Sequence, residues 1–238
     1  MQSFIAKKSS LTLACLFASF CATNASADIY FSEYVEGSSN NKALEIYNSS
    51  ETPVNLSGYK VEYYFNGNTA AGLTINLSGT VPAKGVFVLA HGSASSTILA
   101  TATQINSSGW FNGDDAIVLK NGTTILDAIG QIGVDPGVEW GTALISTADN
   151  TLRRKAAVTT GRTNATGSFD PSTEWEGFAT DTFDNLGSYQ GSTSGNGNGN
   201  SNGNQASSCG SASTLISAIQ GSGSASPLVG SNVSVEAV

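Results

Sequence analysis

Residues 116–129 read Ala-Ile-Val-Leu-Lys-Asn-Gly-Thr-Thr-Ile-Leu-Asp-Ala-Ile, and this stretch decides the fold class. Residues 116–119 form a fully apolar run of strand length, and residues 123–129 are rich in β-branched and aliphatic side chains. Asn121-Gly122 separates the two runs, which is the pattern of a type I′ β-hairpin. The stretch therefore predicts two neighbouring antiparallel strands.

Runs of the same kind recur along the first part of the chain, bounded by turn residues. They cover residues 29–35, 43–47, 59–65 and 86–89. No amphipathic window of helical length lies among them, and many short strands at such intervals are typical of a sandwich or a barrel. About 160 residues are enough to fold independently. We therefore predict one all-β domain over residues 28–190.

The first 27 residues have the features of a secretory signal peptide. Lys7 and Lys8 supply a positive start, residues 11–20 are a short apolar run, and Ala25-Ser26-Ala27 matches the cleavage pattern. The apolar run is shorter than the roughly 20 residues that span a bilayer. We expect cleavage after Ala27 and a secreted, extracellular product without a membrane span. A lipid anchor on one of the two cysteines of this segment is the alternative.

The charge balance argues against a general nucleic-acid clamp. The chain has ten basic and 18 acidic residues, and two lysines leave with the signal, so the mature net charge is −10. An acidic surface repels phosphate backbones. Charged residues are only 12% of the chain, about half the usual share, as is common in extracellular β proteins.

The composition changes after the predicted sandwich. Residues 191–213 are mostly Gly, Asn and Ser, so we expect a disordered, flexible linker. Apolar residues return in residues 214–238, where residues 233–238 alternate with period two, as at the start of a strand. A lone strand exposes an unpaired edge. We therefore expect the natural polypeptide to continue beyond Val238.

No catalytic constellation is visible. His91 is the only histidine, which excludes a two-histidine zinc helix, and residues 28–190 contain no cysteine nucleophile. Residues 28–190 contain neither a Gly-x-Ser-x-Gly elbow nor a P-loop. We predict that this chain is not an enzyme by itself, has no catalytic residue and binds no cofactor. His91 is interpreted as a structural or surface residue.

Two pairs of acids are weak candidates for a metal site. Asp114 and Asp115 lie on a predicted tight turn, where they can bind Ca²⁺ or cap the turn. Glu33 lies between Ser32 and Tyr34, and Glu45 between Leu44 and Ile46, so both carboxylates point to one sheet face, opposite the core. A cation can bridge them if the strands pair. We favour the structural alternatives, which are turn capping and a solvated or hydrogen-bonded face.

Arg153-Arg154-Lys155 is the only basic cluster, and we interpret it as a strand-end surface, with contact to DNA phosphate as the alternative. The three tryptophans are interpreted as packing residues, with a platform for sugars or bases as the alternative. They are Trp110, Trp140 and Trp175.

Residues 32–48 read Ser-Glu-Tyr-Val-Glu-Gly-Ser-Ser-Asn-Asn-Lys-Ala-Leu-Glu-Ile-Tyr-Asn, and this stretch resembles the bacterial lamin-tail domain. Further similar segments follow in the family's order. They are residues 56–59, 85–90, 112–119, 127–130 and 151–155. The resemblance covers nearly all of residues 28–190 and implies an immunoglobulin-like β-sandwich of the lamin-tail type.

Residues 219–230 read Ile-Gln-Gly-Ser-Gly-Ser-Ala-Ser-Pro-Leu-Val-Gly. They are similar to the segment that opens an oligonucleotide-binding (OB) barrel in secreted ExeM/NucH-like nucleases of the endonuclease/exonuclease/phosphatase family. The resemblance implies that residues 214–238 begin a truncated OB-fold-like domain. It also implies a non-catalytic N-terminal module of a DNA-degrading enzyme, serving in targeting, substrate capture or domain packing. The enzyme's missing catalytic domain would use a divalent metal, Mg²⁺ or Ca²⁺.

The same resemblance implies the partners. They are the downstream domains of the same polypeptide and, through them, extracellular DNA. Cys209 is the only cysteine outside the predicted signal, and an odd thiol in an exported chain suggests a disulfide with a cysteine beyond Val238. The alternative function is a stand-alone secreted or cell-surface adhesion or glycan-binding module, because lamin-tail-like sandwiches occur in varied surface proteins.

Overall fold

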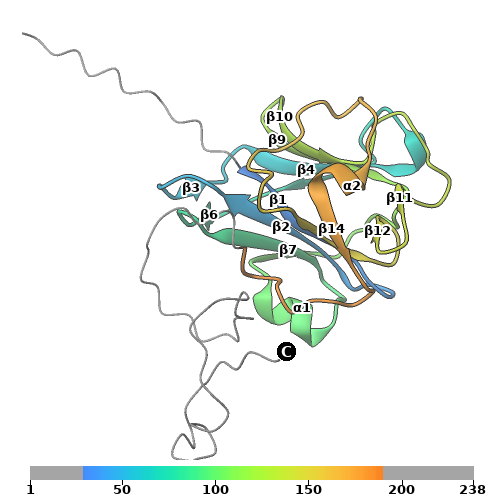
Figure 1. The fold of residues 1–238 in the computed structure, drawn as a ribbon. Coiled ribbons are helices and arrows are strands. Elements are labelled where there is room, and N and C mark those ends of the chain that lie inside the picture. The colour runs from blue at the N-terminus through green and yellow to red at the C-terminus, as the bar shows by residue number, and fades with distance from the viewer. Residues whose placement is uncertain (1–28, 190–238) are drawn as a thin grey trace, which may run out of the picture. The chain divides into compact units, whose positions relative to one another are not determined.

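The computed structural model describes residues 29–189, which form two main β-sheets packed face to face (Figure 1). The six-stranded sheet contains, in spatial order, β14 (Trp175–Phe178), β13 (Thr151–Arg154), β1 (Ile29–Glu36), β2 (Lys42–Asn48), β7 (Val86–His91) and β8 (Gln104–Asn106). The four-stranded sheet contains β10 (Thr124–Ile129), β9 (Ala116–Asn121), β4 (Tyr59–Tyr64) and β5 (Leu73–Asn76). The predicted all-β, immunoglobulin-like sandwich is confirmed.

Pairing within the main sheets is antiparallel except between β7 and β8, which run parallel. The remaining elements are short. They are the pairs β3 (Val54–Asn55) with β6 (Thr80–Val81) and β11 (Gly141–Thr142) with β12 (Ile145–Ser146), the 3₁₀ turn η1 (Phe65–Gly67), and the helices α1 (Ser96–Thr101) and α2 (Pro171–Glu174). No helix among residues 29–189 is long and apolar enough to cross a membrane.

The main core lies between the two sheets. Alternate residues of each strand point into it, as period-two alternation requires. Phe31, Leu44 and Phe87 come from the six-stranded sheet, and Tyr63 and Ile117 face them from the other. All five side chains are fully buried, so apolar burial is the main stabilising term of the sandwich.

The predicted β9–β10 hairpin forms, but its turn differs from the prediction. Asn121 still pairs with Thr124, so the two loop residues are Gly122 and Thr123. Gly122 has φ +59°, while Thr123 has no positive φ, which fits a type II′ turn with glycine first. The type I′ prediction is therefore wrong by one residue. The shift lets the Gly122 N–H donate to the Gly58 carbonyl at 2.9 Å.

A second, smaller apolar cluster covers the outer face of the six-stranded sheet. Val35, Ala43, Val88 and Ala90 of the sheet pack against α1 and against a segment that follows β14. We call that segment, residues 179–189, the strap. In Figure 1 it is the orange coil that runs from β14 past α1. This face is therefore covered by the chain itself and is not solvated.

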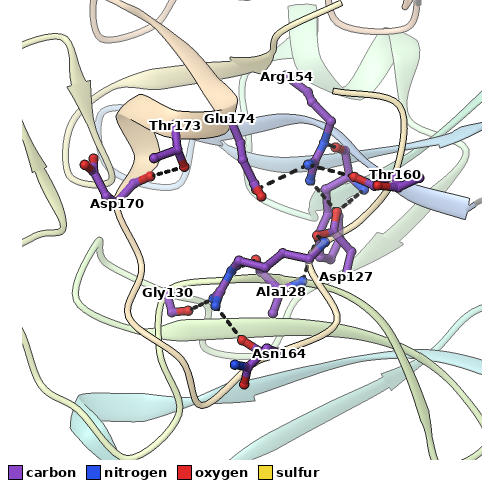
Figure 2. A network of polar contacts seen from close by, with 11 residues as sticks. Asp127, Ala128, Gly130, Arg154, Thr160, Asn164, Asp170, Thr173 and Glu174 are labelled. Atoms are coloured by element: carbon purple, nitrogen blue, oxygen red, sulfur yellow. Dashed lines mark hydrogen bonds and ion pairs between the residues drawn. The ribbon is translucent and has the colours of Figure 1, made fainter. Parts of the chain in front are cut away.

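The sheets are also joined by a buried polar network, which Figure 2 shows from close by. Asp127 of β10 is fully buried and accepts the N–H of Phe31 in β1 at 2.8 Å. Its carboxylate also forms an ion pair with Arg154 of β13, whose guanidinium donates to the Phe31 carbonyl. Both β1 and β10 have a bulge at this point. The two bulges thus meet at one carboxylate.

A second arginine completes the network from the loop before α2. The Arg162 N–H donates to Asp127 at 2.8 Å, and its guanidinium donates to the carbonyls of Ala128 and Gly130 along β10. These contacts satisfy backbone groups at the edge of the four-stranded sheet, which would otherwise be open to another strand.

Several sequence predictions concern parts outside the described residues. These are the signal peptide of residues 1–27, the linker of residues 191–213, the barrel start of residues 214–238 and the pairing of Cys209. They remain predictions.

Replacing Asp127 by alanine is expected to lower the free energy of unfolding by about 3–5 kcal/mol, because it leaves Arg154 buried without its counter-ion. Urea unfolding followed by tryptophan fluorescence measures the change. The matched control is Glu51→Ala, which removes an exposed partner of Lys84 and should change stability by less than about 1 kcal/mol. A similar small loss in both variants would contradict the network's role.

Candidate functional site

Glu33 and Glu45, two of the candidate metal residues, face each other directly on β1 and β2. Both are fully buried under the strap. The two oxygens of Glu45 accept hydrogen bonds from the Ser32 hydroxyl at 2.6 Å and from the Gly187 N–H of the strap at 2.7 Å. The sequence alternation therefore placed the carboxylates correctly side by side, and the strap supplies one of their partners.

Glu33 has fewer partners than Glu45. Arg153 Nε lies 3.4 Å from its Oε2 as an ion pair, but neither oxygen accepts a hydrogen bond of normal geometry. Burial raises the pKa of Glu33 to about 8, against the attraction of Arg153 and with added repulsion from Glu45. Burial also raises the pKa of Glu45, while its bonds from Ser32 and Gly187 lower it. Burial therefore favours the protonated form of both carboxyl groups.

A cation bridge between these carboxylates finds no further ligands. Among residues 29–189, no three His, Cys, Asp or Glu side chains converge to hold a metal ion. Both oxygens of Glu45 already accept protein hydrogen bonds. Their contacts are those of an ion-pair and hydrogen-bonding group of the sheet face, and the metal site between Glu33 and Glu45 stays a prediction.

Asp114 and Asp115, the other candidate pair, lie on the loop that leads into β9. Asp115 Oδ1 accepts the Asn66 N–H at 2.8 Å, and Oδ2 accepts the Asn112 N–H at 3.2 Å. The Asn112 side-chain amide, oriented to donate, reaches both carboxylates. Burial, together with the charge of Asp114, raises the pKa of Asp115 to about 6. Asp115 therefore ties two loops together, as the turn-capping interpretation requires.

The basic residues of the described part all have partners within the chain. Six are in ion pairs, namely Lys42, Lys60, Lys84, Lys120, Arg153 and Arg154. The other two donate to backbone carbonyls, Lys155 to Ser172 at 2.7 Å and Arg162 to β10. The interpretation of Arg153-Arg154-Lys155 as a strand-end surface is wrong for Arg154, which is 3% exposed. The alternation of β13 points it into the sandwich.

His91 and the tryptophans have structural contacts. His91 is largely buried, and its Nδ1 accepts the Ser93 N–H at 3.1 Å beside the ring of Trp110. Trp140 and Trp175 are buried in the main core, and Trp110 packs against it. No carboxylate orients the imidazole among its recorded contacts, so the geometry offers no acid–base relay at this position.

A hollow lies on the surface of the described part, beside β11, β12 and α2. It is lined by Gly141, Thr142, Ile145, Phe169, Asp170 and Ser172. Asp170, its only carboxylate, accepts the Ser172 N–H at 2.9 Å and thereby caps α2. The hollow therefore lacks the paired titratable groups that hydrolytic chemistry needs.

The two packed sheets define the class as an immunoglobulin-like β-sandwich. Residues 22–133 match the family model of the lamin tail domain, a β-sandwich module that is non-catalytic by itself. The match ends shortly after β10, so β11 to β14 and the strap lie beyond it. A search among curated proteins gave no match.

The structure predicts that Asp115 is a structural residue and not a calcium ligand. Asp115→Ala leaves two backbone N–H groups without an acceptor and should cost about 1–3 kcal/mol. Adding calcium or a chelator should leave the melting temperature of the unmodified protein unchanged. A calcium-dependent rise that disappears in the variant would contradict this prediction. Asp135→Ala on an exposed loop serves as the control.

Proposed function

We propose that residues 28–190 are the non-catalytic N-terminal accessory module of a secreted, metal-dependent DNA-degrading nuclease. The accessory role is supported by one observation: the charged side chains of the described part contact other residues of the same chain. The eight lysines and arginines of the described part all have partners in the same chain. The candidate acids likewise bond to neighbouring loops or lie under the strap.

The nuclease parent rests on sequence. The predicted signal peptide supports export, and residues 219–230 resemble the start of the barrel that precedes the catalytic domain in secreted nucleases. A lamin tail domain in front of such a barrel fits that order of domains. The divalent metal and the catalytic residues belong, in this proposal, to the polypeptide beyond Val238.

The contacts of the basic side chains help to decide between targeting, substrate capture and domain packing as the role of the module. Electrostatic capture of DNA needs lysines or arginines that are free to replace counter-ions at phosphates. Here Arg153 is engaged by Glu33 and Asp184, and Lys120 by Glu62 and Tyr64. We therefore favour targeting, or packing against downstream domains, over direct capture of the substrate.

The chain of residues 28–238 should show no measurable DNA binding near physiological salt. Fluorescence anisotropy of a labelled duplex tests this, and a dissociation constant weaker than about 10⁻⁴ M is expected, since non-specific binders lie at 10⁻⁴–10⁻⁶ M. Asp184→Asn releases one partner of Arg153 and is the matched variant, which should bind no better. Micromolar binding that weakens with salt would restore direct DNA capture as the role.

The complete secreted gene product should degrade plasmid DNA with Mg²⁺ or Ca²⁺ and stop when a chelator is added. A version lacking residues 28–190 should keep the hydrolytic activity, because the module supplies no catalytic group. If the complete product leaves DNA intact but binds glycans or cell surfaces, the adhesion module is the correct function.

A further inference from the structure

A row of charged residues crosses the outer face of the six-stranded sheet, and the strap lies over its buried members, Glu33 and Glu45. Neighbouring strands place Glu176, Arg153, Glu33 and Glu45 directly opposite one another, across β14, β13, β1 and β2. From above, Asp184 of the strap forms an ion pair with Arg153. One guanidinium therefore faces four carboxylates. When all of them are ionised, the row carries a net charge of −3.

The strap is held at three places. Near its start, Asp181 accepts the Ser38 N–H at 2.9 Å and the Asn41 amide at 3.0 Å. In its middle, Phe183 and Leu186 pack in the outer apolar cluster. At its end, the ring of Tyr189 lies edge-on to Tyr47, with 4.7 Å between centroids. The two hydrogen bonds of Asp181 are exposed to solvent, so we expect the strap to open more readily than the core.

The two acids under the strap differ in how well they tolerate charge. Glu45 accepts two hydrogen bonds, one of them from the strap, whereas Glu33 has the 3.4 Å contact with Arg153 and a weaker interaction with the Asn185 side chain of the strap. An ionised carboxylate with few hydrogen bonds is costly when it is buried. Ionised Glu33 next to ionised Glu45 adds repulsion in a medium of low dielectric constant. Lifting the strap admits water, which lowers both the cost of burying the charge and the repulsion between the two carboxylates.

We propose that the strap is a pH-dependent latch, closed while Glu33 is protonated and opened when Glu33 and Glu45 are both ionised. The charged and polar groups that face Glu33 come from every neighbouring element. They are Glu45 on β2, Arg153 on β13, Glu176 on β14, and Asp184 and Asn185 on the strap. At the same row, β7 contributes the apolar Val88.

The direction of the pH effect follows from proton linkage. The pKa of Glu33 rises from an ordinary value of 4.5 to about 8 when the strap is closed. The closed form therefore binds more protons between these values, and raising the pH favours the open form. The free energy that favours the closed strap over the open strap is largest below pH 4.5. It falls as the pH rises and levels off above about pH 8.

Opening the latch changes the reach of the chain. The strap directly precedes residues 191–213, which the sequence predicts to be a flexible linker. Its release adds eleven residues to that connection, or roughly 35–40 Å at full extension. This consequence rests on the proposed function: with downstream domains attached, the latch would set the length of their tether to the sandwich.

Amide hydrogen exchange of the mature chain, followed by mass spectrometry, tests the latch. After correction for the intrinsic rate, the opening equilibrium of residues 179–189 should rise more than about tenfold between pH 5 and pH 8 and then flatten. Glu33→Gln removes the titration and should flatten the profile. Glu51→Gln, at an exposed pair with Lys84, should behave like the unmodified protein. Protection that is independent of pH, or a rise that persists in Glu33→Gln, would overturn the proposal.

A second measurement covers the case in which Glu33→Gln does not fold. Carboxyl-detected NMR of the unmodified protein follows the ionisation of Glu33 directly. A midpoint above about pH 7, with matching shifts in the amides of the strap, supports the latch. A midpoint near the ordinary value would overturn it.

Discussion

The packing of the two sheets depends on the buried carboxylate of Asp127. It lies on β10 of one sheet and accepts the N–H of Phe31 from β1 of the other. Burying such a group is costly unless it is hydrogen-bonded and paired. Arg154 provides the counter-charge, and Arg162 brings the later loop to the same point. Three regions far apart in the chain, at β1, at β10 and between β13 and Arg162, must therefore reach one place before the sandwich is stable.

The same principle governs the rest of the described part, where polar side chains are used to join segments of the chain. Asp115 joins two loops at one end, Asp181 fixes the strap to the β1–β2 turn, and Glu62 holds two lysines on the face of the four-stranded sheet. The lysines pull the pKa of Glu62 down to about 2, although burial opposes this shift. Within the described part, acidic side chains thus pair with basic side chains of the same chain.

The sequence predicted the fold class and six main strands, because alternation, apolar runs and turn residues mark these strands in a single sequence. It also placed Glu33 and Glu45 on one face. It missed Arg154, since a basic triplet looks like a surface when the strand's partner is unknown. It missed the strap as well, because residues 179–189 have no periodicity, and only long-range contacts such as that of Asp181 with Ser38 reveal their role.

The central claim is that this sandwich is the front module of a secreted nuclease, and the most direct measurement is the DNA sequence of the gene past the codon for Val238. The account predicts an open frame that continues through a barrel into a metal-dependent phosphodiesterase domain with its own acidic residues and histidines. A stop codon immediately after Val238 in intact genomic DNA would contradict the claim and leave a self-contained secreted binding module.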